Sequence, residues 1–150
     1  MSNIDAQLDH VCLAVRRLDA ARQILERTLG YTPRTNPVEN TRQQVIVQFM
    51  SKSGSLDIKL IQPNSPESPL TDFIKRSGGG LHHLAFKTPS VQDAVAQIEQ
   101  MGAKIVAAPA PGEAFEDSLI AFAFLGAGLN VEFIESDARR DLVERPNAGT

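Results

Sequence analysis

Apolar residues along this chain follow two different spacings, which together predict a mixture of strands and helices. Short segments in which apolar and polar residues alternate predict strands, and longer segments with apolar residues three or four positions apart predict helices. Strands are expected at residues 8–15, 31–36, 43–50, 56–62, 81–88, 104–108, 119–125 and 129–135. Helices are expected at residues 18–29, 69–75 and 91–101, and residues 109–118 are expected to form an acidic loop containing proline and glycine.

The second half of the chain repeats the first half at a constant offset. His83 aligns with His10 and Glu132 aligns with Lys59, because both pairs are 73 positions apart (83 − 10 and 132 − 59). Apolar positions match at the same offset, namely Leu84 with Val11, Phe86 with Leu13, Phe122 with Phe49, Val131 with Ile58, and Phe133 with Leu60. An ordered series of matches at one offset indicates an internal duplication.

The order of elements within each repeat predicts a single α+β domain made of two βαβββ units. The first unit covers about residues 7–62, a connector covers residues 63–80, and the second unit covers about residues 81–135. Residues 136–150 are a polar tail that is expected to fray. A single unit leaves one face of its sheet uncovered, so two units are expected to pack together and enclose a cup.

Alternation along the strand at residues 56–62 decides where Lys59 points. Lys59 shares one strand face with Asp57 and Ile61, while the neighbouring isoleucine and leucine share the other face. If that apolar pair packs under a helix, Lys59 points into the cup. The alternative is that Lys59 lies on a solvated sheet face. Because Lys59 matches Glu132 in the other repeat, we favour the cup.

Two of the three histidines hold equivalent positions in the two repeats. His10 shares a strand face with Cys12, and this face is expected to line the cup. His83 is the partner of His10, whereas His82 has the opposite orientation along its strand and is interpreted as structural. The alternatives are a pair of hydrogen-bonded core histidines for His10 and His83, and a small packing thiol for Cys12.

Composition narrows the classes of partner. A net charge of −3, the lack of a basic run and an aromatic content of 5% argue against nucleic acid and anionic membrane. One cysteine excludes an intrachain disulfide and is typical of a reducing compartment. No segment resembles a signal peptide or a membrane span, so a cytoplasmic protein is expected.

Three motifs carry a resemblance to a known family: Asp9-His10-Val11-x-x-Ala14-Val15, His82-His83-Leu84, and Glu132 in the last strand. With the two βαβββ repeats, they resemble the vicinal oxygen chelate superfamily, the group of glyoxalase I, bleomycin-resistance proteins and extradiol dioxygenases. The resemblance covers roughly residues 7–135. Within this superfamily, the order and spacing of residues 54–63, 68–73 and 79–83 are most similar to those of methylmalonyl-CoA epimerases.

This resemblance implies a cupped eight-stranded mixed sheet with helices outside and a divalent metal at its centre. Carried over to this chain, the ligand positions are His10, Lys59, His83 and Glu132. The family has glutamine or glutamate where this chain has Lys59, and a protonated lysine cannot ligate a metal. Zinc, cobalt, manganese or nickel could still bind to His10, His83 and Glu132, but the charge of Lys59 argues for no metal.

The departure at position 59 suggests that the Lys59 ammonium replaces the metal. Lys59 would pair with Glu132 and donate to the two histidines, and this centre would stabilise an enolate or bind a carboxylate. The family's epimerases also use a carboxylate on the third strand as a base, and residues 43–50 contain no aspartate or glutamate. The candidate catalytic residues that the repeat singles out and the resemblance implies are His10, Lys59, His83 and Glu132.

Two classes of function remain open. The first is an epimerase-like or isomerase-like enzyme that transfers a proton next to a carbonyl in a small acid or acyl thioester, with a glyoxalase-like lyase as a variant. The second is a small-molecule binding protein of the resistance type without chemistry. The resemblance implies a homodimer. The candidate substrate-binding residues are Cys12, Asp57, Asn130 and Glu113.

Overall fold

The computed structural model describes residues 3–144, which form one mixed nine-stranded sheet with three α-helices. The elements are β1 (Gln7–Ala14), α1 (Leu18–Leu29), β2 (Thr32–Pro33), β3 (Val38–Asn40), β4 (Val45–Ser51), β5 (Asp57–Pro63), α2 (Pro69–Ser77), β6 (Gly80–Lys87), α3 (Val91–Gln100), β7 (Lys104–Pro111), the 3-10 turn η1 (Glu113–Phe115), β8 (Leu119–Phe124) and β9 (Asn130–Ile134). The sheet order is β2-β4-β5-β1-β6-β9-β8-β7, and β3 pairs with β4.

Strand register confirms the internal duplication. The parallel pair β1 and β5 places Cys12 opposite Lys59, and the parallel pair β6 and β9 places Ala85 opposite Glu132, which is the same register moved by 73 positions. The antiparallel neighbours repeat this relation, because Phe49 pairs with Lys59 and Phe122 pairs with Glu132. The two repeats therefore place Lys59 and Glu132 at equivalent points, and β1 and β6 join them antiparallel at the centre.

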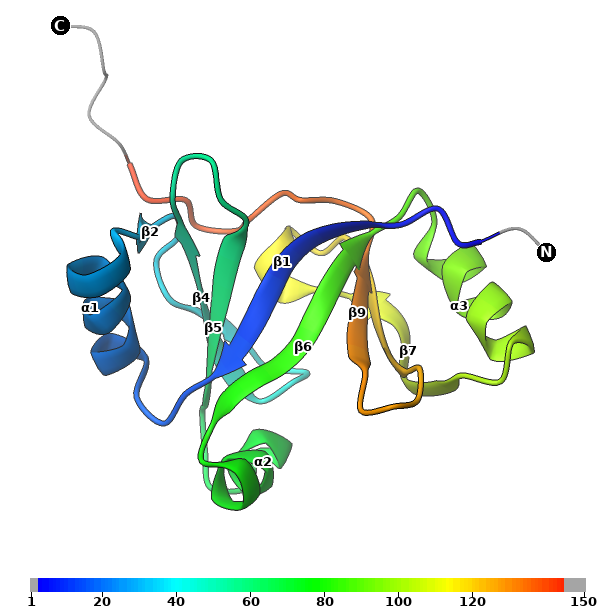
Figure 1. The fold of residues 1–150 in the computed structure, drawn as a ribbon, viewed down its shortest axis with the longest axis horizontal. Coiled ribbons are helices and arrows are strands. Elements are labelled where there is room, and N and C mark those ends of the chain that lie inside the picture. Colours follow the sequence, from blue (N-terminus) through cyan, green and yellow to red (C-terminus); the bar gives the residue numbers. More distant parts are fainter. Residues whose placement is uncertain (1–2, 145–150) are drawn as a thin grey trace, which may run out of the picture.

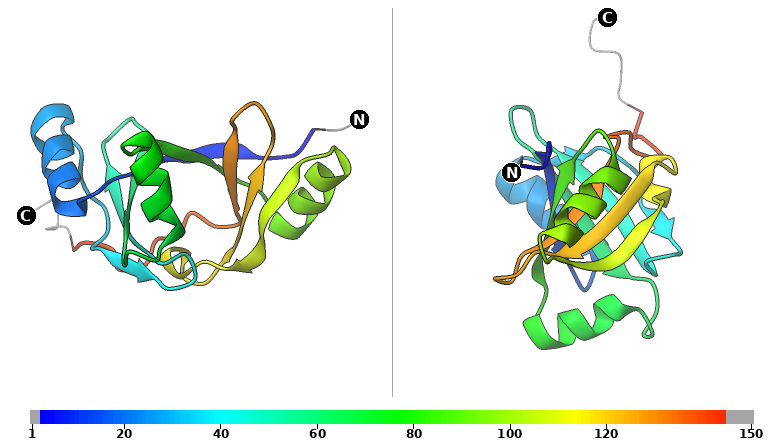
Figure 2. Two further views of the ribbon diagram at one scale, coloured as in Figure 1. Left: turned by 90° about the horizontal axis from the view of Figure 1, so that it is seen from below. Right: turned by 90° about the vertical axis from the view of Figure 1, so that its right-hand side faces the viewer.

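The helices divide the apolar residues into three clusters. Figure 1 shows α1 and α3 at opposite ends of the molecule, with α2 beside β5 and β6, and Figure 2 shows the curved sheet between them. Leu60 packs under α1, and Phe133 packs under α3. Leu70 and Ile74 of α2 pack instead with Ile61 on the concave side. The connector helix therefore closes one side of the cup.

Most predicted elements are present, and the differences are confined to strand ends and one added strand. Within the predicted strand at residues 31–36 only the short strand β2 (Thr32–Pro33) forms, and the added strand β3 (Val38–Asn40) follows it after Pro37. β7 continues to Pro111, so part of the expected loop at residues 109–118 pairs with β8 instead. Within the described part of the chain, no helix combines the length and apolar character needed to cross a membrane.

The expectation that the tail frays is wrong for residues 136–144. This segment runs back from β9 across the molecule towards α1 (Figure 1). The Val143 N–H donates to the Arg34 carbonyl at 3.0 Å, and the Arg140 N–H donates to the Ala114 carbonyl at 3.0 Å. Arg139 is buried. A buried arginine anchors the segment, which composition alone could not reveal; residues 145–150 of the predicted tail lie outside the described residues.

Candidate active site

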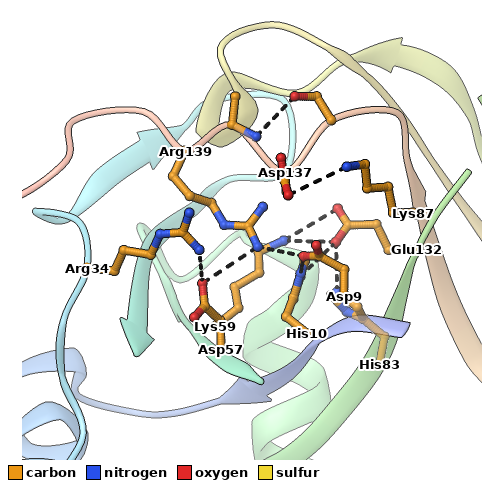
Figure 3. Close-up of polar contacts among 12 residues, drawn as sticks. Asp9, His10, Arg34, Asp57, Lys59, His83, Lys87, Glu132, Asp137 and Arg139 are labelled. Carbon is orange, nitrogen blue, oxygen red and sulfur yellow. Dashed lines mark hydrogen bonds and ion pairs between the residues drawn. The ribbon is translucent and has the colours of Figure 1, made fainter. Parts of the chain in front are cut away.

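Four buried side chains meet at the middle of the sheet, one from each of its four central strands. His10 comes from β1, Lys59 from β5, His83 from β6 and Glu132 from β9, and these strands are neighbours in the order β5-β1-β6-β9. None of the four residues is more than 4% exposed. Figure 3 shows the four side chains converging. The structure thus brings together the residues that the internal repeat singled out.

An ion pair between Lys59 and Glu132 lies at the centre of this group. Lys59 Nζ is 3.2 Å from Glu132 Oε1 and 3.4 Å from Glu132 Oε2. Burial disfavours the ionised carboxylate, but the Lys59 ammonium and the two neighbouring histidines outweigh it and hold the pKa of Glu132 well below its usual value. Lys59 has three N–H donors, so this pairing leaves one donor for another acceptor.

A hydrogen-bonded row extends from Glu132 through His83 to His82. His83 Nε2 is 3.3 Å from Glu132 Oε1, and His83 Nδ1 is 2.8 Å from His82 Nδ1. Burial lowers the pKa of His83 to about 4 and also lowers the pKa of His82, so both rings are neutral at neutral pH. An ionised carboxylate only accepts, so His83 Nε2 donates, His83 Nδ1 accepts from His82, and His82 Nε2 keeps a lone pair.

The expectation that His82 points away from His83 is wrong. Simple alternation places His82 on the face opposite to His83. The pairing of β1 with β6 is irregular here, because Cys12 pairs with His83 and the next residue, Leu13, pairs with Leu81. His82 is the unpaired residue of this bulge, and a bulge redirects a side chain. Both histidines consequently face the same cavity.

His10 is held from behind by Asp9. His10 Nδ1 is 2.7 Å from Asp9 Oδ2, and its Nε2 is 3.4 Å from Glu132 Oε1 without a hydrogen bond. The ring stacks on Phe115 with centroids 5.9 Å apart. Burial acts against ionisation of Asp9, but the His10 hydrogen bond and the Arg139 charge lower the pKa of Asp9 to about 2. Asp9 is thus ionised at neutral pH and fixes the orientation of His10.

Arg139 from the C-terminal segment completes the wall behind His10, and the sequence did not reveal it. Its Nη2 donates to Asp9 Oδ2 at 2.5 Å and lies 3.7 Å from Asp57 Oδ2 (Figure 3). Its guanidinium carbon is 4.2 Å from the ring centroid of Phe49 and 5.2 Å from that of Phe115. Arg139 therefore combines ion pairing with stacking on aromatic faces.

A cavity of about 300 Å³ opens onto the central group. Lys59, His82 and His83 line its polar part, and Val47 and Phe122 belong to its apolar walls. His10 and Glu132 do not line it and are fully buried. Next to the central group, the cavity thus presents one ammonium group and two imidazoles.

The candidate substrate-binding residues have different surroundings. Asn130 lines the cavity. Cys12 is fully buried, and burial raises the pKa of its thiol to about 12. Asp57 lies 2.6 Å from Arg34 Nη1 and forms part of the wall behind the centre. Glu113 accepts from residues 41 and 42 at 2.7–3.2 Å and so fixes the turn at the cavity mouth.

The donor set for the metal that the family resemblance implies is present but altered. Ligand atoms of His10, His83 and Glu132 lie within 4.8 Å of one another. Lys59, however, directs its ammonium at the carboxylate oxygens that a metal would use. A protonated amine offers no lone pair and repels a cation. The residues present therefore do not suit a divalent metal.

Comparison with known proteins identifies the same family as the sequence motifs. Residues 9–124 match the sequence model described as the Glyoxalase/Bleomycin resistance protein/Dioxygenase superfamily. The uncharacterized protein YqjC of Bacillus subtilis is 38% identical over 81 residues, which cover 53% of this chain and 56% of YqjC. The mitochondrial methylmalonyl-CoA epimerase of Bos taurus is 29% identical over 101 residues, which cover 67% of this chain and 57% of the relative. The matches thus span just over half the length of each relative.

The fold is also that of a solved epimerase complex. A methylmalonyl-CoA epimerase in complex with methylmalonyl-CoA and NH4+ superposes with a TM-score of 0.77 and 25% sequence identity. The superposition covers 89% of this chain and 96% of that chain. The expected cupped mixed sheet is therefore confirmed, with α1 and α3 outside it and a short ninth strand added.

Proposed function

Because the chain belongs to the Glyoxalase/Bleomycin resistance protein/Dioxygenase superfamily, we propose that it is an epimerase-like isomerase acting next to the carbonyl group of an acyl thioester. The observation that carries this proposal is the row from Glu132 through His83 to His82, which ends at a cavity also lined by Lys59. A bovine relative and a solved structural neighbour are methylmalonyl-CoA epimerases, which supports a thioester substrate.

In the proposed reaction, His82 is the proton acceptor. Its Nε2 lone pair takes the proton from the carbon next to the carbonyl, and the C–H electron pair forms the enolate. The charged His82 ring donates its hydrogen bond to His83, and His83 donates its own to Glu132, so the carboxylate at the end of the row stabilises the charge on His82. This row replaces the third-strand carboxylate of the family's epimerases, because β4 contains no aspartate or glutamate.

Lys59 supplies the positive charge at the oxygen of the enolate. Lys59 is buried and lines the cavity, so its remaining N–H donor is available to the enolate oxygen, and a fixed donor at a buried site stabilises developing negative charge strongly. Besides the protonated His82, Lys59 is a second group that could return a proton to the enolate, since it lines the cavity together with the two histidines. Return of a proton from Lys59 to the opposite face of the enolate would invert the carbon, and return from His82 would restore it.

The direct test is exchange of the substrate hydrogen with solvent. Short α-branched acyl-CoA thioesters are incubated with the protein in deuterium oxide, and loss of the α-proton signal is followed by NMR. The proposal predicts exchange that depends on the protein. Binding of the thioesters without exchange would instead identify a non-catalytic binding protein of the same superfamily.

His82→Gln is expected to lower the exchange rate about 100-fold or more, because an amide keeps the shape and polarity of the side chain but cannot accept the proton. The KM is expected to change little. Gln43→Ala is the matched control, because Gln43 lines the same cavity outside the row. A loss in the Gln43 variant equal to that in the His82 variant would contradict the assigned base.

A further inference from the structure

We propose that the acyl group bound at this centre carries no charge, so that the substrate is a thioester of a monocarboxylic acid rather than of a dicarboxylic acid. This inference rests on the proposed function and adds the class of substrate. The basis of the inference is the net charge of the groups around Lys59. This net charge is lower than that of a centre in which a divalent cation takes the place of Lys59.

The groups that meet the ligand carry balanced charges. The Lys59 ammonium is paired with both oxygens of Glu132 at 3.2 and 3.4 Å, so these two residues have a net charge of zero. His83 points one ring nitrogen at Glu132 and the other at His82 Nδ1, 2.8 Å away, so His83 is a donor to the carboxylate and an acceptor from His82, which is the neutral form of its ring. A divalent cation with a single carboxylate ligand would leave one positive charge for an anionic substrate, and this pair leaves none.

The groups behind the centre are also paired with one another. Asp9 is bonded to Arg139, and Asp57 is bonded to Arg34 and lies 3.7 Å from Arg139. These residues form alternating positive and negative charges, as Figure 3 shows. The wall contains two cations and two anions, so it too has no charge left over. No unpaired cation within the described residues lies behind Lys59 to balance a substrate carboxylate.

A carboxylate on the acyl group would therefore be buried close to Glu132 without a partner. Like charges in a low-dielectric site repel strongly, and an unpaired buried ion is costly. The proposed proton transfer avoids this cost, because the proton leaves the substrate and stays on His82. Substrate and site together keep a net charge of zero while the enolate forms.

The cavity walls also suit an uncharged acyl group. Apart from Lys59 and the two histidines, most of the lining is aliphatic or aromatic, including Val45, Val47, Ile61, Leu70 and Phe122, and its other uncharged polar residues are Asn40, Gln43 and Asn130. The remaining charged residue of the lining is Arg42, which is exposed in the turn at the mouth. Arg42 is placed to meet the anionic carrier end of a thioester, away from the reacting carbon.

The test uses two ligands that differ in one substituent. Isobutyryl-CoA and methylmalonyl-CoA share the carrier, the thioester and the branched carbon, but a methyl group in the first is a carboxylate in the second. Their binding to the whole protein is measured by titration calorimetry at neutral pH. We expect isobutyryl-CoA to bind at least about tenfold more tightly, because of the like-charge penalty. Arg42→Gln is expected to weaken both ligands by the same factor.

The possible outcomes separate this inference from the proposed function. Equal or tighter binding of methylmalonyl-CoA, with exchange of its α-proton, would overturn the uncharged acyl group and keep the epimerase-like activity. If Arg42→Gln weakened methylmalonyl-CoA alone, its carboxylate would lie at the mouth, which would overturn the assigned direction of the ligand. If neither thioester bound, both proposals would be overturned.

Discussion

Arg139→Met is expected to lower the free energy of unfolding by about 3–5 kcal/mol, the range for removing one partner of a buried ion pair. Arg139 is the charge partner of Asp9, and it lies near Asp57. Methionine retains an apolar side chain against Phe49 and Phe115, so the loss reports the charge rather than a large cavity. Denaturant unfolding followed by circular dichroism measures the difference.

Arg140→Met provides the matched control one residue along the chain. The Arg140 side chain is 34% exposed, against 1% for Arg139, and it pairs with Asp117 at the surface. Exposed ion pairs contribute about 0–1 kcal/mol, so this variant should remain close to the parent protein. Equal destabilisation by the two substitutions would contradict the role assigned to the buried guanidinium.

Lys59→Gln is expected to increase the affinity for divalent zinc or cobalt by about 100-fold or more, because a positive charge about 4 Å from the ion is removed. The substitution also provides an amide oxygen beside His10, His83 and Glu132, whose ligand atoms already lie within 4.8 Å of one another. Calorimetric titration gives the affinity, and elemental analysis after dialysis gives the metal content.

Lys52→Gln is the control for this gain, because Lys52 is an exposed lysine next to β4 that bonds to the Leu29 carbonyl. It removes the same charge from the protein without changing the centre. If the Lys59 variant keeps its fold and still binds no metal, the charge of Lys59 is not what keeps metal out of the parent protein. Equal metal affinity in the parent and in the Lys59 variant would lead to the same conclusion.

The fold and the central group were predictable because the repeat constrains both. A constant offset of 73 positions can be read directly from the chain, and the parallel pairs β1/β5 and β6/β9 obey it residue by residue. Lys59 follows the simple alternation of its strand, since Ile58 and Leu60 pack under α1. For this reason its position in the cup could be predicted from the strand period together with its match to Glu132 in the other repeat.

Two features of the site depend on geometry that the strand period does not contain. His82 faces the cavity because a bulge interrupts the pairing of β6 with β1, and alternation cannot predict a bulge. Arg139 and Arg140 are adjacent arginines in a polar segment, yet only the first is buried. Their difference arises from long-range contacts of the C-terminal segment with Arg34 and Ala114.

The measurement that tests the central claim most directly is NMR detection of the Lys59 side-chain nitrogen in protein labelled with nitrogen-15 lysine at neutral pH. The ion pair with Glu132 predicts a nitrogen bearing three protons that exchange slowly with water, and this signal should be missing in Lys59→Gln. A nitrogen bearing two protons, or a signal that exchanges as fast as that of exposed Lys52, would contradict the presence of a buried ammonium at the centre of the cup.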